Sequence, residues 1–185
     1  MNYTPAYVIP LEKVNLIVHD SSCVQPEYEK NWPENQLHNL NLSPAKDAWL
    51  LTHRPPWGII NCQKHNDNKP LIIMNEHANL QSFLEPFPDS LTTIFSGHIH
   101  AFQAIRLAQN AIQLFVIGNS GVNLEKDRPP EILKNTRLED KKIDYAVSLI
   151  ESGYGIAKYA CQKWSLQAKN KKGNALIQLD CKYTG

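Results

Sequence analysis

Short apolar runs that stop at polar residues or at proline place the strongest constraint on how this chain can fold. The clearest are residues 14–18 (VNLIV), 48–51 (AWLL) and 91–95 (LTTIF). Runs of four or five such residues are too short for a helix and are typical of buried strands. The second run is followed by Pro55 and Pro56, and proline cannot donate a hydrogen bond within a sheet. The sequence therefore predicts a sheet whose buried strands end in polar loops.

The second half of the chain is predicted to form antiparallel hairpins. Four further strands are expected there, over residues 101–107, 111–117, 154–166 and 175–182. The first two flank Gln109 and Asn110, a pair typical of a hairpin turn. The last two are joined across residues 169–174, where Gly173 can adopt a positive φ. Residues 124–138 are charged, contain proline, and are predicted to be a loop.

Two helices are expected beside these strands. Residues 34–40 are predicted to hold a short one, and residues 71–83 carry an imperfect apolar stripe at helical spacing. Strands with few helices indicate an α/β (α+β) layered domain built on a mixed sheet. The chain has 185 residues, a length that fits a single domain over residues 1–185.

Composition narrows the class of protein further. Lys+Arg number 19 and Asp+Glu 18, so the formal net charge is +1, whereas general nucleic-acid binders carry a clear basic excess. No apolar run reaches the ~18 residues of a membrane span, and no secretory signal is visible at the N-terminus, which leaves localisation open. Cys23, Cys62, Cys161 and Cys181 form no CxxC pair, so we expect ordinary thiols rather than a zinc ribbon.

Histidines follow two of the predicted buried strands. His53 comes after residues 48–51, and His98-Ile-His100 comes after residues 91–95. The carboxyl ends of strands are where open α/β sheets place their ligands, and residues two apart on a strand point the same way. Imidazole nitrogen suits zinc, iron, copper and nickel. A lone histidine is more often a surface or core residue, but the two motifs together favour a metal site.

The same residues resemble those of a known family. Leu50-Leu-Thr-His53-Arg-Pro-Pro-Trp57, followed by Phe95-Ser-Gly-His98-Ile-His100, is similar to the calcineurin-like metallophosphoesterases, which include the purple acid phosphatases. The strand that ends at Asp20-Ser21 resembles the one that precedes the first block, and Ile117-Gly-Asn-Ser-Gly121 resembles the segment that follows the second. The resemblance runs in the same order from about residue 14 to residue 121.

This resemblance implies a sandwich of mixed sheets and a centre of two metal ions (Zn, Mn or Fe). His53 and His98 would bind one ion and His100 the other. It implies hydrolysis of phosphate mono- or diesters, in which metal ions bind phosphate oxygens and activate a water. Arg54, next to the ligand His53, would contact a phosphate oxygen of the substrate; a salt bridge or a solvent-facing Arg54 is the alternative.

Three other blocks of the family are missing. The chain contains no Asp-x-His, no Gly-Asp and no Gly-Asn-His, and these carry the bridging aspartate and the asparagine ligand. The chain therefore resembles the C-terminal portion of such an enzyme. We expect it to pair with the missing half or with a second copy of itself, because unpaired sheet edges associate, or else to cover the exposed face with its own loops, such as residues 23–47.

Several alternatives remain open from the residues alone. The chain is a hydrolase fragment with half of a dinuclear site, a non-catalytic binding module that holds at most one metal, or a mononuclear enzyme with three histidines on zinc. Trp57 packs in the core or lines a substrate pocket. Asp20 accepts a hydrogen bond from a metal-binding histidine, or it forms a turn.

Overall fold

The structure of the protein is a computed structural model, which describes residues 6–22, 37, 40–43, 46–59, 87–108, 112–121, 123–124, 132–133, 137–138, 141–160 and 163–181. These residues form the strands β1 (Tyr7–Pro10), β2 (Val14–His19), β3 (Asp47–Thr52), β4 (Leu91–Ser96), β5 (Phe102–Leu107), β6 (Gln113–Ile117), β7 (Ile132–Leu133), β8 (Arg137–Leu138), β9 (Lys141–Leu149), β10 (Gly153–Ala160), β11 (Lys163–Asn170) and β12 (Ala175–Cys181). No helix occurs in this part of the chain. The predicted helix over residues 71–83 lies outside the described residues, as does the one over residues 34–40 apart from Leu37 and Leu40.

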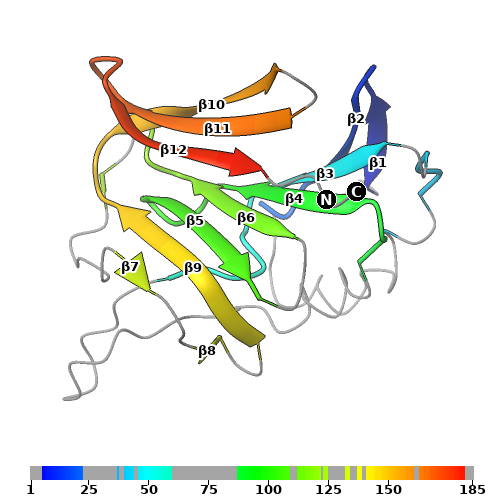
Figure 1. The fold of residues 1–185 in the computed structure, drawn as a ribbon, viewed down its shortest axis with the longest axis horizontal. Helices are drawn as coiled ribbons and strands as arrows, with labels where there is room; N and C mark the ends of the chain where they lie inside the picture. The colour runs from blue at the N-terminus through cyan, green and yellow to red at the C-terminus, as the bar shows by residue number, and fades with distance from the viewer. Residues whose placement is uncertain are drawn as a thin grey trace.

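A large mixed sheet forms the body of the molecule (Figure 1). Its strand order is β1-β2-β3-β4-β6-β5-β9-β7, with β8 paired to β9. The four strands β2, β3, β4 and β6 run parallel to one another, whereas β1, β5, β7 and β9 join by antiparallel pairing. The three short apolar runs form β2, β3 and β4, which confirms the predicted buried strands, and the structure shows that they are parallel.

The second sheet, β10-β11-β12, covers one face of the large sheet (Figure 1). Its buried residues Leu166 and Ala168 pack with Phe102 and Phe115 in a shared core. The rings of Trp49 on β3 and Trp164 on β11 have centroids 4.2 Å apart, which joins the two sheets at the margin of this core. The result is a partial sandwich of mixed sheets, and the predicted fold class is confirmed.

The opposite face of the large sheet carries the second core cluster. Ile17, Leu50 and Ile94, each fully buried, line this face from three neighbouring parallel strands. Trp57 and Ile59, which follow β3 in a loop, are buried in the same cluster. This loop is therefore part of the core and not a surface connection.

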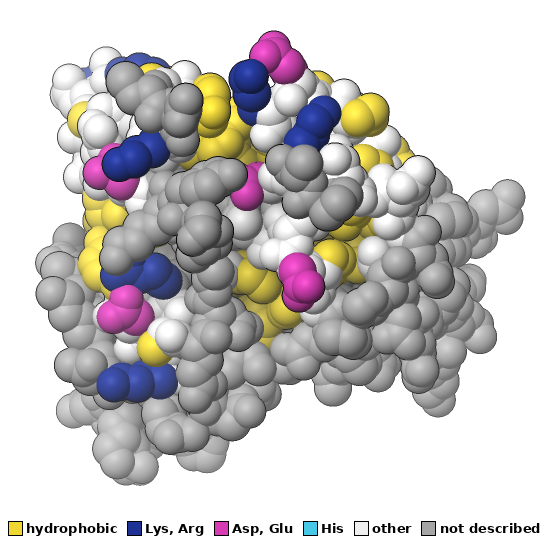
Figure 2. Space-filling view, turned by 45° about the vertical axis from the view of Figure 1, so that its right-hand side comes forward, with side chains coloured by type: hydrophobic (Ala, Val, Ile, Leu, Met, Phe, Trp, Pro, Cys, Tyr) yellow, Lys and Arg dark blue, Asp and Glu magenta, His cyan; other side chains and the backbone are white. Residues whose placement is uncertain are grey.

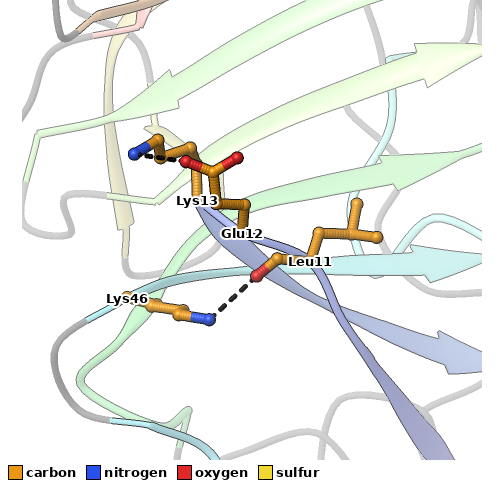
Figure 3. A network of polar contacts seen from close by, with 4 residues as sticks. All are labelled: Leu11, Glu12, Lys13 and Lys46. Atoms are coloured by element: carbon orange, nitrogen blue, oxygen red, sulfur yellow. Dashed lines mark hydrogen bonds and ion pairs between the residues drawn. The ribbon is translucent and has the colours of Figure 1, made fainter.

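Strand β1 forms one edge of the large sheet. A two-residue turn at Glu12-Lys13 joins it to β2, with the Leu11 N–H bonded to the Val14 carbonyl (2.9 Å). Figure 3 shows how this turn is fastened: Lys46 Nζ donates to the Leu11 carbonyl (2.9 Å), and Lys13 pairs with Glu12 (2.8 Å). Fully exposed ion pairs of this kind add little to the stability of a fold.

A proline at the end of β1 limits pairing of this edge strand with another chain. Pro10 lacks an N–H, and proline is tolerated in a sheet at edge strands, where it weakens pairing with another chain. Tyr7, Ile9 and Leu11 remain 49%, 41% and 44% exposed. Figure 2 shows apolar side chains on the surface with Lys and Arg close to Asp and Glu among them. No helix of the described residues is long and apolar enough to cross a membrane.

The hairpins of the second half follow the prediction in part. Strands β5 and β6 pair antiparallel, and Gly173 has φ +86° in the turn between β11 and β12, both as expected. The single strand predicted over residues 154–166 is wrong, because β10 ends at Ala160 and β11 begins at Lys163. The predicted loop over residues 124–138 is wrong at β7 and β8, which pair with β9.

Candidate metal centre

The candidate ligands meet at one edge of the large sheet. Because β2, β3, β4 and β6 are parallel, their carboxyl ends lie along the same edge. Asp20 follows β2, His53 follows β3, His98 follows β4, and Asn119 follows β6. The strand order places the loop that carries His53 directly beside the loop that carries His98.

His53 and His98 are in contact. Nδ1 of His98 lies 3.2 Å from Nε2 of His53, and the ring centroids are 5.1 Å apart at an interplanar angle of 72°. Two imidazole nitrogens bound to one tetrahedral zinc at 2.0–2.1 Å would be separated by about 3.3–3.4 Å. The observed spacing suits either a hydrogen bond, with one ring donating its N–H, or two lone pairs directed at one ion. Both side chains are exposed, so a solvated ion can reach them.

The backbone at His98 is in an uncommon conformation. Its φ is +66°, and no other described residue except glycine has a positive φ. The Ile99 N–H bonds to the Gly97 carbonyl (2.8 Å), so His98 is the central residue of a γ-turn of the rarer, positive-φ form. Such a conformation costs of order 1–3 kcal/mol and persists only where the surrounding structure enforces it. Strain of this kind is concentrated at functional sites.

His100 occupies a second turn of the same loop. The Ala101 N–H bonds to the Ile99 carbonyl (2.8 Å), with His100 between them. Among the described residues, no group of three or more His, Cys, Asp or Glu side chains is arranged to hold a metal ion. His53 and His98 are thus brought together and His100 does not complete a triad with them in this part of the chain. The two paired imidazoles fit part of a metal's ligand shell, and anionic ligands would have to complete it.

The buried hydroxyl groups of Ser21 and Thr52 hold the start of the loop that carries His53. Ser21 Oγ lies 2.8 Å from Thr52 Oγ1 and accepts the N–H of Arg54 (2.8 Å). Thr52 Oγ1 is also 3.4 Å from Nδ1 of His19. These contacts fix the backbone on both sides of His53. Burial lowers the pKa of His19 from 6.5 to about 4, against the opposing effect of the Asp20 charge, so the His19 ring is neutral at pH 7.

Asp20 forms a turn, the second of its two alternatives. Its Oδ1 accepts hydrogen bonds from the backbone N–H (2.9 Å) and the hydroxyl of Ser22. The two hydrogen bonds from Ser22 lower the pKa of Asp20, and burial opposes them only weakly. The carboxylate therefore lies within electrostatic range of His53, while its hydrogen bonds go to the turn.

The remaining sequence candidates are placed as follows. Arg54 is half-buried beside His53, with its backbone held by Ser21. Trp57 is fully buried, and its ring lies 5.9 Å from that of Phe87, which is a packing role and not that of a pocket wall. Both residues belong to the loop that follows β3.

One supporting residue escaped the sequence reasoning. Gln103 on β5 is fully buried; its Oε1 accepts the Ile59 N–H (2.9 Å) and its Nε2 donates to the Ile59 carbonyl. These bonds attach the end of the His53 loop to β5. A glutamine inside the apolar run of residues 101–107 was the available signal, because a polar side chain buried in a strand needs hydrogen-bonding partners.

Comparison with solved structures shows what this arrangement resembles. A purple acid phosphatase from yellow lupin (Lupinus luteus) seeds, PPD1, matches 95% of this chain with a TM-score of 0.60 and 13% sequence identity. The fold is similar to that of a purple acid phosphatase. A second match, GAP50 of Plasmodium, also covers 95% of the chain, with a TM-score of 0.54 and 13% identity. That structure is of GAP50 as the anchor in the inner membrane complex of Plasmodium.

These likenesses are of fold alone at such low identity. The chain spans 32% of the lupin enzyme and 52% of GAP50, so it matches about a third and a half of their lengths. No protein-family model and no curated protein matches the sequence.

Proposed function

We propose that this chain is part of a metal-dependent phosphoester hydrolase of the calcineurin-like type, and that His53 and His98 bind one metal ion while His100 binds a second. The observation that carries the proposal is the 3.2 Å spacing of two imidazole nitrogens from separate loops. They meet at the carboxyl edge of a sheet within a fold similar to that of a purple acid phosphatase. A chance pair of surface histidines needs no strained turn, whereas His98 is held at φ +66°.

The residues of this chain would bind the metal ion and orient the phosphoester substrate. When bound, zinc, manganese or iron supplies Lewis-acid catalysis and an activated water for attack on phosphorus. His53 and His98 present neutral imidazole nitrogens to the ion, and the Ser21–Thr52 hydroxyl pair keeps the His53 backbone in place. Arg54 offers a guanidinium that can pair with two phosphate oxygens at once. The exposed position of the histidine pair admits a phosphoester from solvent.

Anionic ligands are the missing component. Neutral imidazoles leave the charge of a metal ion uncompensated, and the described residues offer no carboxylate within a group of three ligands. We infer that aspartates preceding this region in a longer protein, or on a second chain, complete the site. The match to only 32% of the lupin enzyme supports this view.

A second candidate function has its own support. The chain would be a binding module that keeps the fold and at most one metal ion without turnover. Two observations favour it: the paired histidines lack a third ligand among the described residues, and the similar GAP50 is described as an anchor.

Metal content and turnover separate these candidates. The 185-residue chain is loaded with Mn²⁺ or Zn²⁺, desalted, assayed for metal and tested on bis(p-nitrophenyl) phosphate. His53→Ala and His98→Ala are compared with His65→Ala, a histidine outside both motifs. Loss of metal and of turnover in the first two variants alone supports the hydrolase. Because the proposed hydrolase takes its aspartates from preceding residues or from a second chain, metal binding without turnover supports the binding module only where turnover is also absent from the longer protein or assembly that supplies them. Equal metal content in all four proteins refutes both.

A further inference from the structure

We propose that Ile99 is the positioning residue of the histidine pair, held between Gly58 and Gly118 so that His98 stays in its positive-φ turn against His53. The inference depends on the proposed function only for what the pair binds. Ile99 acts through the backbone of the loop. It lies between the two histidines of the His98-Ile-His100 motif.

A chain of backbone hydrogen bonds passes through this residue. Gly97 N–H bonds to the His53 carbonyl (3.0 Å), and Ile99 N–H bonds to the Gly97 carbonyl (2.8 Å). The Ile99 carbonyl accepts from Ala101, whose own carbonyl accepts from Gly118 N–H (3.2 Å). The loop is thus tied to His53 at one end and to the exit of β6 at the other, with Ile99 at its centre.

Gly118 lets the backbone of Ile99 approach β6 closely. A Cβ at residue 118 would overlap the carbonyl oxygen of Ile99 and would lie 2.9 Å from its carbonyl carbon. Real Cβ atoms do not approach backbone atoms so closely, so only glycine fits here without moving the loop. A backbone atom cannot rotate away as a side chain can. The position of Gly118 therefore fixes where Ile99 sits.

Gly58 receives the side chain of the same residue. A Cβ at residue 58 would overlap Cδ1 of Ile99, while Cγ1 would stay at an ordinary 3.7 Å. Gly58 is itself immobilised, because the neighbouring Ile59 is bonded to Gln103 through both its N–H and its carbonyl. Ile99 therefore packs against a rigid part of the His53 loop and connects the two loops that carry the imidazoles.

These contacts lead to unequal expectations for the two glycines. At residue 58 the obstacle is one methyl group, so Ile99→Val removes it and should rescue Gly58→Ala. At residue 118 the obstacle is backbone, so Ile99→Val should not rescue Gly118→Ala. A general loss of stability would not show this difference, because nearby sites couple only where they share a contact.

The test uses the full 185-residue chain with Zn²⁺ alone as the probe. Nuclear Overhauser contact between the His53 and His98 rings reports their approach, and titration calorimetry reports Zn²⁺ affinity. We expect Gly58→Ala to lose the ring contact and to bind Zn²⁺ about 10–100-fold more weakly, the range typical of residues that support metal ligands. Gly58→Ala/Ile99→Val should recover both properties, and Ile99→Val alone should retain them.

Two further variants keep the proposal falsifiable if Gly58→Ala does not fold. Ile99→Ala keeps both glycines but removes the side chain that packs against Gly58, so it should weaken the contact between the His53 and His98 rings. The control Ile156→Ala on β10 should leave this ring contact intact. The proposal is overturned if the wild type lacks the ring contact, if Gly58→Ala or Ile99→Ala retains it fully, or if Ile99→Val does not rescue Gly58→Ala. A third outcome separates the two proposals. If the wild type shows the ring contact and Gly58→Ala loses it, but the wild type binds no Zn²⁺, the positioning role is supported and the proposed function is refuted.

Discussion

Acidification should destabilise this protein through His19. The side chain is 2% exposed at the end of β2, with Nδ1 beside the hydroxyl of Thr52. Burial lowers its pKa from 6.5 to about 4, so the folded state keeps the ring neutral while the unfolded chain protonates it. Between these two pKa values the unfolded state binds more protons. Stability is therefore fully present above pH 6.5 and is lost as the pH falls toward 4.

The magnitude follows from the two pKa values. For a pKa of 6.5 unfolded and about 4 folded, the loss relative to pH 7 is roughly 2 kcal/mol at pH 5 and roughly 3 kcal/mol at pH 4. Against a total stability of about 5–15 kcal/mol this is a large fraction. With a urea m-value of about 2 kcal/mol/M, the unfolding midpoint should fall by about 1 M between pH 7 and pH 5.

The control is a variant that cannot titrate. His19→Asn keeps a polar group beside Thr52, and the carboxylates remote from residue 19 titrate alike in both proteins. Urea unfolding at pH 7 and pH 5 gives the loss for each protein, and the difference between the two losses isolates His19. If the wild type and His19→Asn lose the same free energy over this interval, the buried neutral ring does not govern acid stability and the reasoning fails.

Three further substitutions test the packing around the site. Trp57→Ala should lower the free energy of unfolding by about 3–5 kcal/mol in urea titration, and a cost below about 1 kcal/mol would place the ring outside the core. Gly97→Ala should raise it by about 0.4–1 kcal/mol, since Gly97 has no positive φ and an added Cβ would meet only the His53 carbonyl at an ordinary 3.6 Å; destabilisation would contradict this geometry. Arg106→Ala should cost less than about 1 kcal/mol, because its ion pair with Asp144 is largely solvated, and the cost should shrink further in 0.5 M NaCl.

The central strands could be predicted from the sequence because their apolar runs carry the signal locally. Strands β1, β7, β8 and β9 could not. Strand β9 contains Lys142 and Asp144 on exposed positions, and it is a strand because β5 pairs with it along its length. The break between β10 and β11 falls near Cys161 and Gln162, which lack the Gly, Asn or Pro that mark a turn.

The candidate site divides in the same way. The approach of His53 to His98 follows from two parallel strands with histidines at their carboxyl ends, so sequence alone can suggest it. The residues that hold His53 and His98 together depend on which loops face each other. The structure places the tight contacts between these loops at Gly58 and Gly118, where an added Cβ would overlap Ile99. A glycine's role in packing is set by its distant neighbour, which local spacing does not reveal.

The histidine pair has a consequence for how a metal and a phosphate would bind. Two neutral imidazoles leave the full charge of a divalent ion in place, so under the proposed function an anion at the site is stabilised strongly. A phosphoester held by the ion and by Arg54 would itself supply the negative charge that the described residues lack. Because coupling between two ligands is reciprocal, phosphate should raise metal affinity by the same factor by which the metal raises phosphate affinity. Supplying carboxylates from a partner or from preceding residues should reduce this coupling, since they would neutralise the ion before phosphate arrives.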